Sequence, residues 1–228
     1  MKPIAFIKND FKEKFGIPRQ SGLIREVESR IIFDEKYRIP DAVRGLEEFS
    51  HLWLIWVFSE GFASKENDNE FSPTVRPPRL GGNERMGVWA TRSPNRPNPI
   101  GLSCVEIVSV EPETPDGPVI TVRGADLMDG TPILDIKPYI AYADAHPDAA
   151  CSFASSAPDM QKLTVEGADL IPDGKEKEAI IAILSGDPRP SYLEDASREH
   201  GMTYGTYNIR FTVSGDTLTI TDVQDTHD

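Results

Sequence analysis

Seven short segments, either apolar throughout or alternating between apolar and polar residues, dominate the first 140 residues. Alternation with a period of two places successive side chains on opposite faces of a strand. The run LWLIWVF is apolar on both faces, which predicts a central strand covered on both sides. The pattern as a whole predicts strands at residues 4–7, 26–33, 52–58, 87–92, 101–110, 119–123 and 133–139.

Helical periodicity is rare in the same region. Pro40 and Asp41 form a good helix entry, which predicts a short helix over 41–49. One short helix among seven strands leaves no regular alternation of strand and helix. The fold class predicted is therefore mainly β: an antiparallel sheet closed into a non-Rossmann barrel.

The last third of the chain has a different composition. Residues 145–173 are rich in Ala, Ser and Pro and are interpreted as a linker. A helix is predicted over 175–184, stopped by Gly186, and a hairpin over 207–213 and 218–223. Two domains follow from this: a barrel over 1–145, and a linker with a small α+β appendage over 146–228 that binds tRNA or packs in a dimer.

Charge is distributed unevenly along the chain. The net charge is −13, yet residues 71–101 contain five arginines and one acid, a local +4 that leaves −17 for the rest. The segment TVRPPRLGGNERMGVWATRSPNRPNPIGLS (74–103) combines arginines with prolines that stiffen a loop and glycines that let the backbone approach a ligand. It is interpreted as an anion-binding loop. The alternative is an ordinary solvated surface loop.

Several classes of protein lack their signatures here. Cys104 and Cys151 form no CxxC pair, and the four histidines are scattered, so no metal site is predicted. Phosphate-binding, GxSxG and HExxH motifs are absent. The N-terminus lacks a signal-like apolar stretch, and the longest apolar run is too short to cross a bilayer. We expect a soluble, cytoplasmic protein without a membrane partner.

Three polar segments are candidates for one site: PRQ at 18–20, the arginine-rich loop, and GADLMDGTPILDIKPY at 124–139. The last contains three acids, which suit ribose hydroxyls or an ammonium group. Two alternatives stay open from spacing alone. In one, Asp129 and Gly130 form only a hairpin turn; in the other, Asp135 forms a surface ion pair with Lys137.

Longer motifs in these segments carry a family resemblance. TVRPPRLGG (74–82), RMGVWATRSPNRPNPIGLS (85–103) and DLMDGTPILDIKPY (126–139) resemble the TsaA-like domain of tRNA N6-threonylcarbamoyladenosine methyltransferases. KEKFGIPRQSGL, DAVRGLEEFSHLW and DPRPSY are also similar to that family. The resemblance implies a β-barrel S-adenosylmethionine enzyme, usually a homodimer. It would methylate the threonylcarbamoylated adenosine beside the tRNA anticodon.

The resemblance also implies which residues contact the cofactor. They fall in the PRQ segment, after the central strand, in the arginine-rich loop and in the acidic turn. The set is Pro18, Arg19, Gln20, Ser59, Glu60, Arg92, Leu102, Asp126, Leu127, Met128 and Asp129.

The proposed reaction adds two further hypotheses. The acceptor nitrogen lies between an adenine ring and a carbonyl, so its lone pair is delocalised and removal of its proton helps the attack. We expect a carboxylate to act as the base, Asp135 first and Asp129 second. Arg76, Arg79, Arg85 and Arg96 are assigned to tRNA phosphates or to the threonyl carboxylate. The rival interpretations are a non-catalytic S-adenosylmethionine-binding regulatory protein and an RNA-binding barrel without a cofactor.

Overall fold

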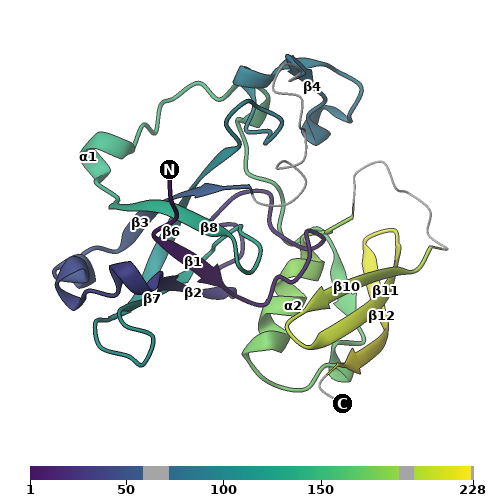
Figure 1. The fold of residues 1–228 in the computed structure, drawn as a ribbon. Coiled ribbons are helices and arrows are strands. Elements are labelled where there is room, and N and C mark those ends of the chain that lie inside the picture. The colour runs from purple at the N-terminus through teal and green to yellow at the C-terminus, as the bar shows by residue number, and fades with distance from the viewer. Residues whose placement is uncertain (59–71, 190–197, 227–228) are drawn as a thin grey trace.

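A closed antiparallel barrel forms the first part of the molecule. The structure is a computed structural model that describes residues 1–58, 72–189 and 198–226. Six strands close the barrel, and Figure 1 shows it as a unit separate from the C-terminal strands. In spatial order the strands are β1 (Ala5–Lys8), β2 (Glu28–Phe33), β7 (Val119–Arg123), β6 (Ile100–Glu111), β3 (His51–Val57) and β8 (Pro132–Pro138). The predicted antiparallel barrel is confirmed.

Alternating burial explains why these segments form strands. In β3, Leu52, Leu54 and Trp56 point into the barrel and are buried, while the residues between them are only partly buried. The barrel core is filled by side chains of this kind from every strand, as expected for a small barrel. The prediction that β3 is covered on both faces was wrong, because its outer face stays partly exposed within this chain.

Two predicted elements have a different form in the structure. The segment 41–49 contains two 3-10 helices, Pro40–Val43 and Leu46–Glu48, instead of one α-helix. Gly45 separates them with a φ of 85°, a left-handed conformation that an α-helix does not accommodate. The strand predicted at 87–92 is also wrong. Only β5 (Met86–Gly87) pairs there, with β4 (Thr74–Val75), and a 3-10 helix follows at Val88–Ala90.

The C-terminal part is a four-stranded sheet with one helix. The sheet order is β10 (His200–Tyr204), β11 (Tyr207–Ser214), β12 (Thr217–Asp225) and β9 (Thr164–Glu166), the last parallel to β12. The helix α2 (Lys175–Ser185) buries Ala179, Ile180, Ile183 and Leu184. The predicted helix and hairpin are confirmed, whereas β9 and β10 were not predicted.

Short helical turns complete the chain. The α-helix α1 (Ala141–Asp144) follows β8. Further 3-10 turns lie at Glu35–Tyr37, Pro78–Leu80, Ser152–Ala154 and Ala168–Leu170. Within the described ranges, no helix has the length and apolar character that a bilayer crossing requires.

The core of the C-terminal unit includes residues from the N-terminal segment. Phe11, Ile24 and Val27 pack with α2 and the four-stranded sheet, although they are far away in sequence. Gly205 also donates its N–H to the carbonyl oxygen of Asp10 at 2.8 Å. The chain between β1 and β2 thus connects the two units, and it carries the PRQ segment at its centre.

Candidate functional site

The barrel wall opens at one end of β6, and this opening gathers the three polar segments. From Glu106 onward β6 pairs with β7, but its first residues have no β7 partner. Ser21 lies there instead, and its hydroxyl accepts the N–H of Cys104 at 3.2 Å. Gly22 donates its N–H to the carbonyl oxygen of Gly124 at 2.8 Å. These bonds hold the PRQ segment against the turn that follows β7.

Side chains from all three segments meet at this opening. Nη1 of Arg92 donates to Oε1 of Gln20 at 2.5 Å, which links the arginine-rich loop to the PRQ segment. The Ser103 hydroxyl donates to Oδ1 of Asp126 at 2.5 Å, which links β6 to the acidic turn. The sequence prediction that these segments converge is confirmed by these contacts. We call Gln20, Arg92, Ser103 and Asp126 the opening cluster.

A buried hydrogen-bond chain fixes the carboxylate of this cluster. Nε1 of Trp56 donates to the Ser103 hydroxyl oxygen at 3.0 Å, and that hydroxyl in turn donates to Asp126. Burial raises the pKa of Asp126, while the bond from Ser103 and the charge of Arg92 act in the opposite direction. Asp126 is therefore a mostly buried carboxylate whose orientation is set by its neighbours.

Gly101 makes this arrangement possible. It is the register partner of Trp56 on the neighbouring strand, and the indole lies across it. A Cβ at residue 101 would lie 2.2 Å from an indole carbon, far inside van der Waals contact.

Gly101→Ala is consequently expected to displace Trp56 and to lower the free energy of unfolding by about 1–3 kcal/mol, as overpacking commonly does. Urea denaturation measures this change. Gly87→Ala is the matched control, because no heavy atom lies within 4 Å of the added Cβ and its φ of −56° suits alanine. Equal stability of the two variants would contradict the role assigned to Gly101.

The other residues expected to contact the cofactor differ in their exposure. Pro18 is buried and Arg19 is exposed, and both immediately precede Gln20. Leu102 is 54% exposed on the outer face of β6. Leu127 is 1% exposed and its carbonyl oxygen accepts a hydrogen bond from Nδ2 of Asn9 at 2.9 Å, whereas Met128 is partly buried. Ser59 and Glu60 lie outside the described residues.

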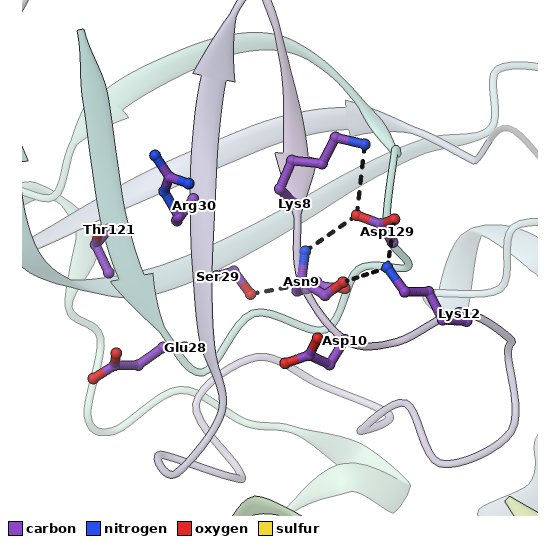
Figure 2. A pocket seen from close by; sticks show the side chains of 9 residues that line it. All are labelled: Lys8, Asn9, Asp10, Lys12, Glu28, Ser29, Arg30, Thr121 and Asp129. Atoms are coloured by element: carbon purple, nitrogen blue, oxygen red, sulfur yellow. Dashed lines mark hydrogen bonds and ion pairs between the residues drawn. The ribbon is translucent and has the colours of Figure 1, made fainter. Parts of the chain in front are cut away.

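Asp129 is held in a different environment from Asp126. Its carboxylate accepts the N–H of Asn9 at 3.2 Å and lies 2.9 Å from Nζ of Lys12 and 3.9 Å from Nζ of Lys8. Figure 2 shows it between the two lysines, in a pocket of about 500 Å³ that Gln20, Arg92 and Asp126 do not line. Burial alone would raise the pKa of Asp129, but the bonds from Lys12 and Asn9 outweigh it and lower the pKa. These contacts make Asp129 a weak base.

Asp135 faces the outside of the barrel. The strand register aligns it with Ile55 on β3, and Ile55 with Leu102 on β6, so the three residues form one row across three strands. With strands about 4.8 Å apart, the backbones of Asp135 and Leu102 are separated by roughly 10 Å. The Asp135 carboxylate is 49% exposed and lies 3.2 Å from Nζ of Lys137. The ion pair considered from the sequence is present, and the carboxylate shares a face with Leu102.

The arginines of the loop differ in the hydrogen bonds that they form. Arg79 donates to the carbonyl oxygen of Ser156 at 2.6 Å, and Arg85 donates to the hydroxyl of Thr74 at 2.9 Å. Arg96 donates three hydrogen bonds to backbone carbonyls of its own loop. Arg76 is exposed, and no salt bridge of the described residues involves it. Arg76 is thus the loop arginine best placed to bind an anion.

Sequence reasoning did not single out Ser21, Trp56 or Ser103 as site residues. Trp56 lies in the barrel core, and only the hydrogen bond from its Nε1 links it to Ser103. One signal was present for Ser103: it is a polar residue at an inward position of an apolar strand, which needs a hydrogen-bond partner when buried. The described parts of the chain contain no group of three or more His, Cys, Asp or Glu side chains able to hold a metal ion.

The fold is a closed antiparallel barrel, distinct from the doubly wound nucleotide-binding sheet, and Arg92, Asp126 and Gly124 lie at its opening. Residues 6–145 match the family described as tRNA-methyltransferase O N-terminal domain, and residues 158–226 match the TrmO C-terminal domain. The chain belongs to the tRNA-methyltransferase O family. The resemblance to the TsaA-like family is confirmed.

Individual relatives agree with this assignment. The chain is 42% identical over 223 residues to a tRNA (adenine(37)-N6)-methyltransferase of Escherichia coli, covering 92% of each sequence. It is 37% identical to a putative S-adenosylmethionine-dependent methyltransferase, RcsF, of Pseudomonas aeruginosa, covering 90% of this chain and 87% of the relative. The crystal structure of TrmO from Pseudomonas aeruginosa superposes with a TM-score of 0.76 at 30% identity, covering 98% and 96% of the two chains.

Proposed function

We propose that this protein is an S-adenosylmethionine-dependent tRNA methyltransferase that methylates N6 of threonylcarbamoyladenosine beside the anticodon. The observation that carries the proposal is the meeting of Gln20, Arg92 and Asp126 at the barrel opening, in a chain similar to tRNA (adenine(37)-N6)-methyltransferases over 92% of its length. The C-terminal unit is proposed to bind tRNA or to pack in the dimer.

The residues of the opening cluster fit the cofactor chemically. S-adenosylmethionine has an ammonium, a carboxylate and ribose hydroxyls, and when bound it supplies an activated methyl group. Asp126 presents a carboxylate suited to the ammonium or the ribose hydroxyls, and Arg92 presents a guanidinium suited to the carboxylate. The close contact of Gly22 with Gly124 keeps side-chain bulk out of this opening. Leu102, which precedes Ser103 in β6, offers an apolar surface on the outer face of the strand.

Asp135 is proposed as the base for the acceptor nitrogen. Bound S-adenosylmethionine would supply the methyl group, and a carboxylate oxygen of Asp135 would accept the N6 proton, directly or through one water. Support comes from the row that Asp135 forms with Ile55 and Leu102 on the outer face. Asp129 is the weaker candidate, because Lys12 and Asn9 occupy its carboxylate.

A homodimer is proposed for the outer face of β3 and β6. Beside the row of Asp135, Ile55 and Leu102, Ile100 is 40% exposed, and its register partner Val57 is also apolar. An exposed apolar stripe of this kind is typical of a protein interface. Sedimentation of the purified protein tests it, and a monomer at micromolar concentration would contradict it. The free thiols of Cys104 and Cys151 suit the reducing cytoplasm, where we propose that the enzyme acts.

Arg76→Gln is expected to weaken tRNA binding and to reduce the slope of log K against log salt by about one, because one phosphate contact is lost. Arg44→Gln is the matched control, since Arg44 is exposed but lies in the 3-10 region paired with Asp41. Filter binding over a series of salt concentrations measures both variants. An unchanged slope for Arg76→Gln would remove Arg76 from the tRNA interface.

The proposal is tested against its two rivals with the purified wild-type protein. Calorimetric titration with S-adenosylmethionine distinguishes the proposed enzyme from an RNA-binding barrel without a cofactor, which would give no heat of binding. Transfer of a labelled methyl group to tRNA distinguishes the proposed enzyme from a regulatory protein, which would bind S-adenosylmethionine without transferring its methyl group. We expect both binding and transfer.

A further inference from the structure

An exposed tryptophan projects from the arginine-rich loop. Trp89 is 67% exposed and lies on the 3-10 turn Val88–Ala90, three residues before Arg92. The chain contains three tryptophans, and the other two are partly or fully buried. An indole is among the largest apolar surfaces a residue can expose, and exposed aromatic groups are concentrated at binding sites.

The loop that carries Trp89 is rigidly built. The Thr91 hydroxyl donates to the carbonyl oxygen of Val88 at 2.9 Å and accepts the N–H of Ser93 at 3.2 Å. Arg96 donates to the carbonyl oxygens of Val88, Thr91 and Ser93 at 3.3, 2.6 and 2.8 Å. These bonds fix the backbone on both sides of the indole, so little entropy remains to be lost when a ligand packs on it.

Arg96 also acts on the ring itself. Its guanidinium carbon lies 5.9 Å from the centroid of the Trp89 ring, within the range of a cation–π interaction. Arg96 is thus a supporting group of the loop, with three of its N–H groups engaged by the backbone. This differs from the phosphate-binding role assigned to it from the sequence.

The surroundings of Trp89 select the class of ligand. Arg76, Arg85 and Arg92 belong to the same loop, and its local charge of +4 favours an anionic partner. Unpaired RNA bases are recognised by stacking on aromatic side chains within positively charged surfaces. A second copy of this acidic chain would also be attracted to the loop and could cover its apolar surface, and the test below separates that case from RNA binding.

We propose that Trp89, supported by Arg96, is a stacking platform for an unpaired nucleobase of the tRNA anticodon loop. This inference rests on the proposed tRNA methyltransferase function and names a base-contacting residue for it. Because Arg92 is only three residues away, the stacked base is the methylated adenosine or a neighbour of it. Stacking does not depend on base identity, so Trp89 contributes affinity and position rather than sequence specificity.

The test compares Trp89→Ala and Trp89→Phe in binding to an anticodon stem-loop RNA. Trp89→Ala should weaken binding by about 5- to 150-fold, which is the loss of about 1–3 kcal/mol for one stacked base at about 1.4 kcal/mol per factor of ten. Trp89→Phe keeps an aromatic ring and should restore most of the affinity. The salt slope should stay unchanged in both variants because no phosphate contact is removed. Bound RNA should also quench the tryptophan fluorescence of the wild type more than that of Trp89→Phe.

Three results would overturn the platform. One is wild-type affinity of Trp89→Ala for the stem-loop, and another is a reduced salt slope, which would indicate a role in charge contacts. The third is conversion of a dimer to monomers by Trp89→Ala, which would place the indole in a subunit interface. Methyl transfer by the wild type is measured in parallel. Its absence would refute the methyltransferase function itself, whereas its presence with an unaffected Trp89→Ala variant would refute only the platform.

Discussion

Asp135→Asn is expected to slow single-turnover methyl transfer by about 10²- to 10⁴-fold at saturating cofactor and tRNA. Asparagine keeps the size of the side chain but cannot take the N6 proton. Because Asp135 is on the outer face and 49% exposed, the substitution should leave the barrel folded. Rapid-quench assays with labelled cofactor measure the rate of the chemical step separately from product release.

Two further variants show whether the lower rate of methyl transfer is caused by removal of the Asp135 carboxylate. Lys137→Gln removes the ion-pair partner and should leave most of the rate, since the carboxylate remains. Asp129→Asn should also keep the rate but lower stability, because Lys12 and Asn9 lose a charged partner. An Asp135→Asn enzyme with the wild-type rate would refute Asp135 as the base. A large loss in Asp129→Asn at unchanged folding would transfer that role to Asp129.

Asp126→Asn is expected to weaken S-adenosylmethionine binding by about 10- to 100-fold, the usual value of a hydrogen bond to a charged group. The carboxylate lies at the opening beside Arg92, where an ionised form binds the cofactor's ammonium or hydroxyls most strongly. Calorimetry measures this loss. Undiminished affinity in a folded variant would exclude Asp126 from the cofactor site.

The pH dependence of binding provides an independent check through Ser103→Ala. Burial raises the pKa of Asp126, and the Ser103 hydroxyl lowers it by hydrogen bonding to the charged form. Removing that hydroxyl should raise the pKa further. The affinity for S-adenosylmethionine falls as Asp126 is protonated. When the pH is lowered, this fall should therefore begin at a higher pH in Ser103→Ala than in the wild type. An identical pH profile would show that the Trp56–Ser103 chain does not act on Asp126. Among the described residues, Arg92 is the charged group that acts on this carboxylate.

The barrel could be predicted from the sequence because its strands are short and amphipathic, and the predicted limits of β7 agree with those observed. Local sequence patterns predicted the wrong element where tertiary contacts or the conformation of a glycine determine the path of the backbone. Gly45 breaks the helix predicted over 41–49, and Arg96 pulls the backbone after Gly87 into a bonded loop instead of a strand.

The site was predictable only in part. Gln20, Arg92 and Asp126 lie in motifs of the family resemblance, which implied a cofactor role for them, and the structure brings these residues together. Ser103 and Trp56 act through one side-chain hydrogen bond between neighbouring strands, which depends on register and on Gly101 being without a Cβ. Asp126 and Asp129 are three residues apart, yet their carboxylates have different partners. Spacing alone could not separate these two roles.

The most direct measurement of the central claim is mass spectrometry of nucleosides from tRNA of a strain lacking this gene, before and after incubation with purified protein. We predict that threonylcarbamoyladenosine gains one methyl group only when both protein and S-adenosylmethionine are present. Asp135→Asn protein should produce little of this product in the same time. An unchanged nucleoside profile with wild-type protein that binds S-adenosylmethionine would contradict the proposed function.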